Sequence, residues 1–80
     1  MALTPILVPK LGMDTTEALL TQWFIQEGDY VSKGAPLVEL ESEKVTFAYE
    51  AEVSGKLAQI VAAAGEQVEM GAVLGYVDTD

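Results

Sequence analysis

An internal repeat is the feature that most constrains the fold of this chain. When the 80-residue sequence is shifted by 37 positions, its two halves align without a gap. The aligned pairs are Leu20 with Leu57, Gln22 with Gln59, Gly28 with Gly65, Asp29 with Glu66, Val31 with Val68, Gly34 with Gly71, Leu37 with Leu74, and Leu40 with Val77. Because neither unit is large enough to bury a core alone, the two must pack face to face.

The apolar runs within each unit have the length of β-strands. Turn-forming residues separate them about every 8–12 positions, which is typical of an all-β sandwich or barrel. A helix is an alternative only at Leu57–Ala64, which Gly55 and Gly65 bracket closely. The sequence therefore predicts one all-β domain, residues 1–80, with repeat units at about 5–42 and 43–79. We expect a flattened barrel or sandwich of two small antiparallel sheets related by a pseudo-two-fold axis.

Two local patterns add detail to this prediction. Positive φ angles are expected at four glycines in matching turn positions: Gly28, Gly34, Gly65 and Gly71. Trp23 and Phe24 are adjacent, so a pleated strand would point them to opposite faces. We expect at least one of the two to pack in the core or between the sheets.

The composition excludes several kinds of function. The chain has no cysteine and no histidine, which removes disulfides, thiolate or imidazole metal sites, and catalysis that depends on a histidine base. We therefore expect no metal site and no catalysis by the domain itself. Thirteen acidic residues against four lysines give a formal net charge of −9. Such a charge disfavours binding to nucleic acid or anionic membranes, because both require basic residues to meet phosphates.

The first ten residues lack the charged and apolar regions of a secretory signal. No apolar run is long enough to cross a bilayer. We expect an intracellular, soluble, monomeric domain, in the cytoplasm or, in a eukaryote, in the mitochondrial matrix.

The segment between the two repeat units carries the candidate chemistry. Leu40 should end one strand and Val45 should begin the next, which leaves Ser42-Glu43-Lys44 for a tight hairpin turn. Without Gly or Asn, this turn favours a type I geometry. Lys44 would then project from a rigid tip, with both chain termini towards the other end. A lone lysine in a loop is ordinarily only a solvated residue, but a lysine presented in this way also suits enzymatic modification.

At this point the chain resembles the biotinyl/lipoyl attachment family, over nearly its whole length. The motifs that carry the resemblance are Val8–Met13, Leu20–Trp23, Glu27–Val31, Lys33–Leu37, Val38–Val45, Gly55–Leu57, Gly65–Val68 and Gly71–Leu74. Biotin acceptors of the family typically have Met on both sides of the modified lysine, whereas Glu43 and Val45 flank Lys44, as in lipoyl domains. The sequence departs from the lipoyl pattern at Thr16 and Ala18, away from the tip.

The resemblance implies a fold, a cofactor and a set of partners. The fold would be the lipoyl/biotinyl hybrid motif, and Lys44 would carry lipoate in an amide bond. This swinging arm would shuttle acyl groups and electrons between a thiamine-dependent decarboxylase, an acyltransferase core and dihydrolipoyl dehydrogenase. The domain would be part of a dihydrolipoamide acyltransferase in a 2-oxo acid or acetoin dehydrogenase complex.

The resemblance also implies recognition roles for the residues beside Lys44. We expect a lipoate–protein ligase or lipoyl transferase to recognise Glu43 and Val45. We expect Glu39 and Glu41 to contribute to docking on partner enzymes, although a solvated strand face would also explain these acids. Two alternatives stay open, a biotin carrier domain of a carboxylase and an unmodified lipoyl-like structural module.

Overall fold

The computed structural model describes residues 2–9, 16–43 and 45–79, and all of the regular structure in these ranges is β-strand. The eight strands are β1 (Leu3–Leu7), β2 (Glu17–Trp23), β3 (Tyr30–Val31), β4 (Pro36–Glu41), β5 (Thr46–Glu50), β6 (Gly55–Ile60), β7 (Gln67–Glu69) and β8 (Val73–Asp78). The described part of the chain therefore contains no helix that could cross a membrane. The segment Leu57–Ala64, where a helix was the alternative, instead begins within β6.

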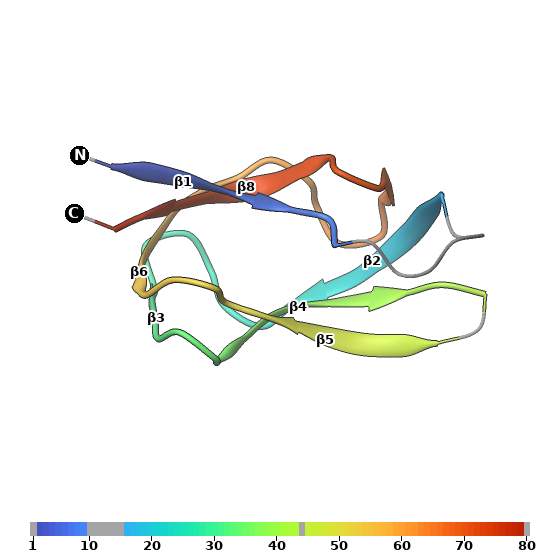
Figure 1. The fold of residues 1–80 in the computed structure, drawn as a ribbon, viewed down its shortest axis with the longest axis horizontal. Coiled ribbons are helices and arrows are strands. Elements are labelled where there is room, and N and C mark those ends of the chain that lie inside the picture. The colour runs from blue at the N-terminus through green and yellow to red at the C-terminus, as the bar shows by residue number, and fades with distance from the viewer. Residues whose placement is uncertain (1, 10–15, 44, 80) are drawn as a thin grey trace.

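The strands form two four-stranded antiparallel sheets that face each other (Figure 1). Their strand orders are β1-β8-β6-β3 and β5-β4-β2-β7. This confirms the predicted pair of small sheets. Within the described ranges no strand pairing joins one sheet to the other, so the two sheets form a sandwich and not a closed barrel.

The repeat units are interleaved between the sheets. Each sheet takes two strands from the first unit (β1–β4) and two from the second (β5–β8). The shift of 37 positions relates β2 to β6, β3 to β7, and β4 to β8, and these pairs occupy equivalent places in the two strand orders. The units therefore do not stack as two separate sheets, and neither unit has a sheet of its own without the other.

Equivalent backbone hydrogen bonds hold the interleaved units together. The Gly28 N–H donates to the Leu57 carbonyl, and the Leu57 N–H donates to the Asp29 carbonyl, both at 2.8 Å. The same exchange recurs between the other turn and the first unit: Gly65 N–H to the Leu20 carbonyl at 2.7 Å, and Leu20 N–H to the Glu66 carbonyl at 2.9 Å. Each turn of one unit is thus bonded to a strand of the other.

The Gly–acid pairs of the repeat have a structural explanation. Gly28 and Gly65 have φ angles of 95° and 92°, a region that only glycine enters at little cost. The carboxylate of Asp29 accepts the Gln26 N–H at 2.9 Å, and the carboxylate of Glu66 accepts the Ala63 N–H. The acid after each glycine therefore closes its own turn. Positive φ is also confirmed at Gly34 and Gly71.

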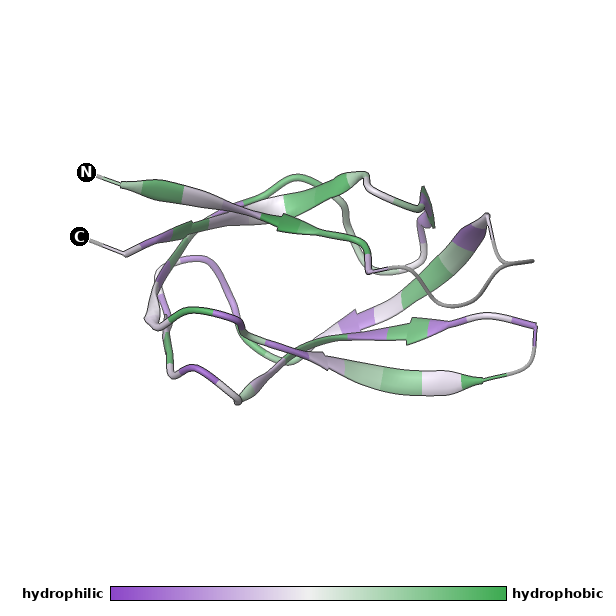
Figure 2. Ribbon diagram, in the orientation of Figure 1, coloured by the Kyte–Doolittle hydropathy of each residue, from purple (hydrophilic) through white to green (hydrophobic). Residues whose placement is uncertain are grey.

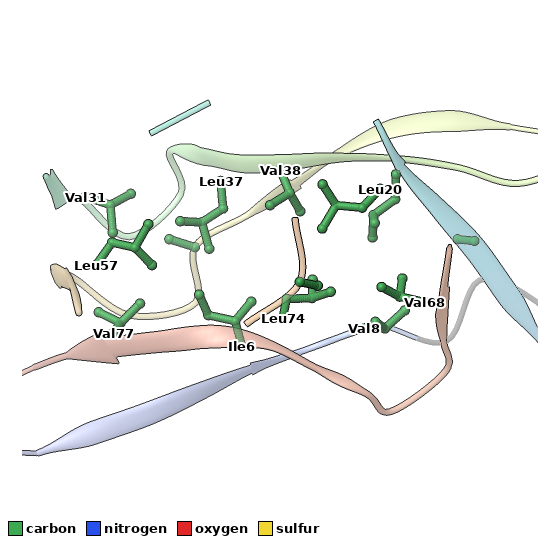
Figure 3. Close-up of a cluster of buried hydrophobic side chains, with 14 residues drawn as sticks. Ile6, Val8, Leu20, Val31, Leu37, Val38, Leu57, Val68, Leu74 and Val77 are labelled. Atoms are coloured by element: carbon green, nitrogen blue, oxygen red, sulfur yellow. The ribbon is translucent and has the colours of Figure 1, made fainter. Parts of the chain in front are cut away.

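The core is a single apolar layer between the sheets (Figure 3). Its buried members come from both units and are Ile6, Val8, Ala18, Leu20, Val31, Leu37, Val38, Leu40, Ala51, Leu57, Ala62, Val68, Leu74 and Val77. Fully burying a leucine contributes about 1.5–3 kcal/mol, and the leucines at 20, 40, 57 and 74 are completely inaccessible. These four come from β2, β4, β6 and β8, so the central strands of both sheets supply the packing.

Both termini lie at one end of the sandwich and the β4–β5 hairpin projects from the other, as predicted (Figure 1). The Thr79 N–H donates to the Ala2 carbonyl at 2.9 Å, which ties the two ends of the described chain together. Hydrophilic residues gather where β4 ends and the hairpin turns (Figure 2). The fold therefore presents a polar tip at the end of the sandwich opposite its termini.

Candidate functional site

The candidate site is the end of the β4–β5 hairpin. Across it, Leu40 pairs with Phe47 and Glu41 pairs with Thr46 in antiparallel register. Leu40 is fully buried, so the base of the hairpin is fixed to the core. Lys44, the predicted acceptor, lies outside the described residues. The residues next to Lys44 in the sequence, Glu43 and Val45, are described and show the surroundings of this position.

Ser42 and Val45 close the loop. The Ser42 N–H donates to the Val45 carbonyl at 2.7 Å. The Val45 N–H donates to the Ser42 hydroxyl oxygen at 3.2 Å, and this hydroxyl lies 3.2 Å from the Val45 carbonyl oxygen. The loop so closed consists of two residues, Glu43 and Lys44. Glu43 does not have a positive φ, whereas a type I′ turn would require one. The predicted tight hairpin is confirmed, and the type I assignment stays a prediction because Lys44 belongs to the turn.

The described neighbours of Lys44 face solvent. Val45 is 49% exposed, and Glu41 and Glu43 are also exposed. No hydrogen bond joins the Glu43 carboxylate to another described residue. An exposed acid on one side and an exposed apolar side chain on the other give an approaching enzyme two different features to recognise. This exposure is compatible with the ligase contacts predicted for Glu43 and Val45, which remain predictions.

Glu39 differs from Glu41 because a second strand holds its side chain. The Thr21 hydroxyl on β2 donates to the Glu39 carboxylate at 2.6 Å, and it also lies 3.2 Å from the Glu39 carbonyl. Glu39 is half-buried, while Glu41 is exposed. A hydrogen bond to an ionised acceptor is stronger than one between neutral groups. The hydrogen bond from Thr21 therefore fixes the direction of the Glu39 carboxylate. An acid that only solvates the strand would not need such a bond.

Trp23 lies between the sheets, opposite Val38 and away from the hairpin tip. Its Nε1–H donates to the Ala62 carbonyl at 2.8 Å, and its ring packs against the core. Phe24 is 42% exposed. The expectation that one of these neighbours packs between the sheets is confirmed, and Trp23 is that residue.

Tyr49 and Glu52 form a pair at the far end of β5. The Tyr49 hydroxyl donates to the Glu52 carboxylate at 2.8 Å. Burial, and then the hydrogen bond and negative charge of Glu52, raise the pKa of Tyr49 to about 12. Glu52 therefore fixes the Tyr49 side chain in addition to facing solvent. No group of three potential metal-ligating side chains occurs in the described ranges.

Comparison with known proteins identifies the family. The family model described as "Biotin-requiring enzyme", which covers biotin and lipoyl attachment domains, matches residues 4–77. The chain belongs to the biotin/lipoyl attachment family.

Curated relatives carry names from two enzyme systems. The dihydrolipoyllysine-residue succinyltransferase component of the 2-oxoglutarate dehydrogenase complex of Bartonella vinsonii is 47% identical over 94% of this chain. The same component of Bacillus subtilis is 39% identical over 90% of the chain. The acetyltransferase component of the acetoin cleaving system of Cupriavidus necator is 34% identical over 91%. The chain spans 18%, 17% and 20% of these relatives, so it corresponds to one domain of each.

Solved structures agree with the lipoyl assignment. The lipoyl domain of the 2-oxoglutarate dehydrogenase complex of Azotobacter vinelandii superimposes with a TM-score of 0.76 at 27% identity, and the match covers 92% of this chain and 94% of that one. The urea carboxylase of Kluyveromyces lactis has a TM-score of 0.79 at 19% identity over 6% of its chain, which shows the shared fold alone. The resemblance to lipoyl domains inferred from the sequence is thus confirmed.

Proposed function

We propose that this chain is the lipoyl carrier domain of the succinyltransferase component of a 2-oxoglutarate dehydrogenase complex, with lipoate in amide linkage to Lys44. The observation that carries the proposal is the closed two-residue loop between Ser42 and Val45. Glu43 and Val45, the described neighbours of Lys44, face solvent at the end of a hairpin anchored in the core. The 47% identity to a succinyltransferase component favours this complex over the acetoin system.

The tip suits a covalent acyl carrier. Attachment through an amide needs an accessible amine, and the described neighbours leave the loop open to an enzyme. The bound lipoyl group would supply the disulfide and thiol chemistry, while the protein supplies attachment and positioning. The hairpin base keeps the point of attachment fixed to a rigid body, and the exposed flanks leave it reachable by several enzymes in turn.

The partners follow from the proposed complex. They are the lipoate–protein ligase, the thiamine-dependent decarboxylase, the acyltransferase core and dihydrolipoyl dehydrogenase. The formal charge of −9 supports docking on basic surfaces. Within the site, Glu39 is the best-defined docking group, because Thr21 holds its carboxylate.

The test is the intact mass of the domain produced in cells supplied with both lipoate and biotin. We expect a gain of one lipoyl amide, mapped by peptide sequencing to Lys44 and abolished by Lys44→Gln. Far-UV circular dichroism of the variant should match the wild type, since the residues on either side of the substitution, Glu43 and Val45, are exposed. A biotinyl adduct would show a biotin carrier instead, and an unmodified mass beside active ligases would show a structural module.

A further inference from the structure

The loop closure at the hairpin tip is unusual in one respect. The two residues that flank a two-residue hairpin loop ordinarily exchange two backbone hydrogen bonds. Here one is made, from the Ser42 N–H to the Val45 carbonyl at 2.7 Å. The Val45 N–H donates instead to the Ser42 side-chain oxygen, at 3.2 Å. The hydroxyl has therefore taken the place of a backbone carbonyl in the hairpin.

This substitution makes the loop geometry depend on a side chain. A hairpin loop without Gly or Asn cannot easily adopt the primed turns that match strand twist, and Glu43 does not have a positive φ. The Ser42 hydroxyl supplies the acceptor for the Val45 N–H, in place of the Ser42 backbone carbonyl. Side chains of this type form local bonds to backbone groups readily. Ser42 is also half-buried, although its neighbours Glu41 and Glu43 are exposed.

We propose that Ser42 is a positioning residue whose hydroxyl clamps the loop and thereby sets how well Lys44 is accepted by the lipoylating enzyme. The inference rests on the proposed function, because it concerns modification of that lysine. A modifying enzyme must bring one ε-amine to its activated substrate, and misplacement of a reacting group lowers rate steeply. A loop whose flanking residues are joined by two bonds should present a narrower set of amine positions than a loop closed by one bond.

The clamp should affect the loop far more than the global fold. It lies at the solvent-exposed tip, whereas stability is concentrated in the core between the sheets. A single net hydrogen bond changes a local equilibrium by up to about tenfold. Ser42→Ala should therefore lower kcat/KM for lipoylation by roughly three- to tenfold, and raise the exchange rate of the Val45 amide by a similar factor. The melting temperature should fall by about 10 °C at most, which is the shift expected if the full cost of one hydrogen bond reached the global fold.

The chain offers a matched control. The Ser54 hydroxyl also accepts a backbone N–H, from Lys33 at 2.8 Å, but it lies in the β5–β6 connection, away from the tip. Ser54→Ala should accelerate exchange at the Lys33 amide and leave lipoylation unchanged. Ser42→Thr keeps the hydroxyl and should restore both the lipoylation rate and the protection of the Val45 amide.

The experiment combines lipoylation kinetics, with a lipoate–protein ligase and the unmodified domain, and amide exchange by nuclear magnetic resonance. Slower lipoylation and faster Val45 exchange in Ser42→Ala, both rescued by Thr, would support the clamp. Equal lipoylation rates for the wild type and Ser42→Ala, or unchanged Val45 exchange, would overturn it. An unmodified wild-type chain would overturn the proposed function as well, and so the two failures are distinguishable.

Discussion

The close approach of β6 and β8 gives a quantitative prediction for Gly75. A Cβ atom at this position would lie 2.4 Å from the Gln59 carbonyl oxygen and 3.4 Å from the edge of the Trp23 ring. The pairing register of β6 against β8 shifts between Leu57 and Gln59, next to the point where the two strands come this close. A contact of 2.4 Å to backbone cannot be relieved by rotating a side chain, so Gly75→Ala must push the strands apart.

Overpacking of this kind costs about 1–3 kcal/mol, or more when backbone has to move. In a domain of this size, 1 kcal/mol lowers the melting temperature by roughly 4–8 °C. We therefore expect Gly75→Ala to unfold about 4–24 °C below the wild type, as followed by circular dichroism or Trp23 fluorescence. Gly28→Ala is the matched control, because its Cβ meets nothing within 4 Å and its cost arises from the φ of +95° alone. A melting temperature for Gly75→Ala within 2 °C of the wild type would refute the steric argument.

Three further predictions follow from single contacts. Trp23→Phe keeps a six-membered aromatic ring but removes the pyrrole part of the indole and its bond to the Ala62 carbonyl. The free energy of unfolding in urea should fall by about 0.5–1.5 kcal/mol for the bond, and further for the lost packing; an unchanged midpoint would contradict this. Thr21→Val releases the Glu39 carboxylate and should weaken docking of the decarboxylase, measured as a raised KM for the lipoylated domain, with no effect on the lipoylation rate. Tyr49 should titrate at about 12 by ultraviolet absorbance. Because its folded pKa lies above the unfolded value of about 10, its contribution to stability is complete below pH 10 and lost as pH rises towards 12, and Tyr49→Phe should abolish that loss.

Much of the fold could be predicted because the repeated residues are those that turns and strands need locally. Gly28 and Gly65 mark turns that need positive φ, and the apolar runs mark strands. The repeat does not record which strand pairs with which. The interleaving depends on bonds such as that between Gly28 and Leu57, which are 29 positions apart. The sequence around either residue does not indicate that the other is its partner. The prediction of two antiparallel sheets packed face to face was therefore correct. The sequence did not predict that each sheet would contain strands from both units.

The candidate site shows the same division. The hairpin and the predicted acceptor came from turn chemistry and from the family resemblance. The roles of Ser42 and Thr21 were missed, because a hydroxyl in a strand or turn gives no signal of its partner. The register of β2 against β4 shifts between Leu20 and Gln22, and Thr21 at this irregularity bonds Glu39. Such an irregularity depends on the packed sheet and cannot be derived from alternation alone.

The most direct test of the central claim is transfer of an acyl group to the lipoylated domain. The domain would be incubated with the thiamine-dependent 2-oxoglutarate decarboxylase and 2-oxoglutarate, and its intact mass measured. We expect a gain of one succinyl group, absent from Lys44→Gln and absent when pyruvate and its decarboxylase are supplied instead. No succinyl gain on a fully lipoylated domain, or an acetyl gain from the pyruvate system, would contradict the assignment to a 2-oxoglutarate dehydrogenase complex.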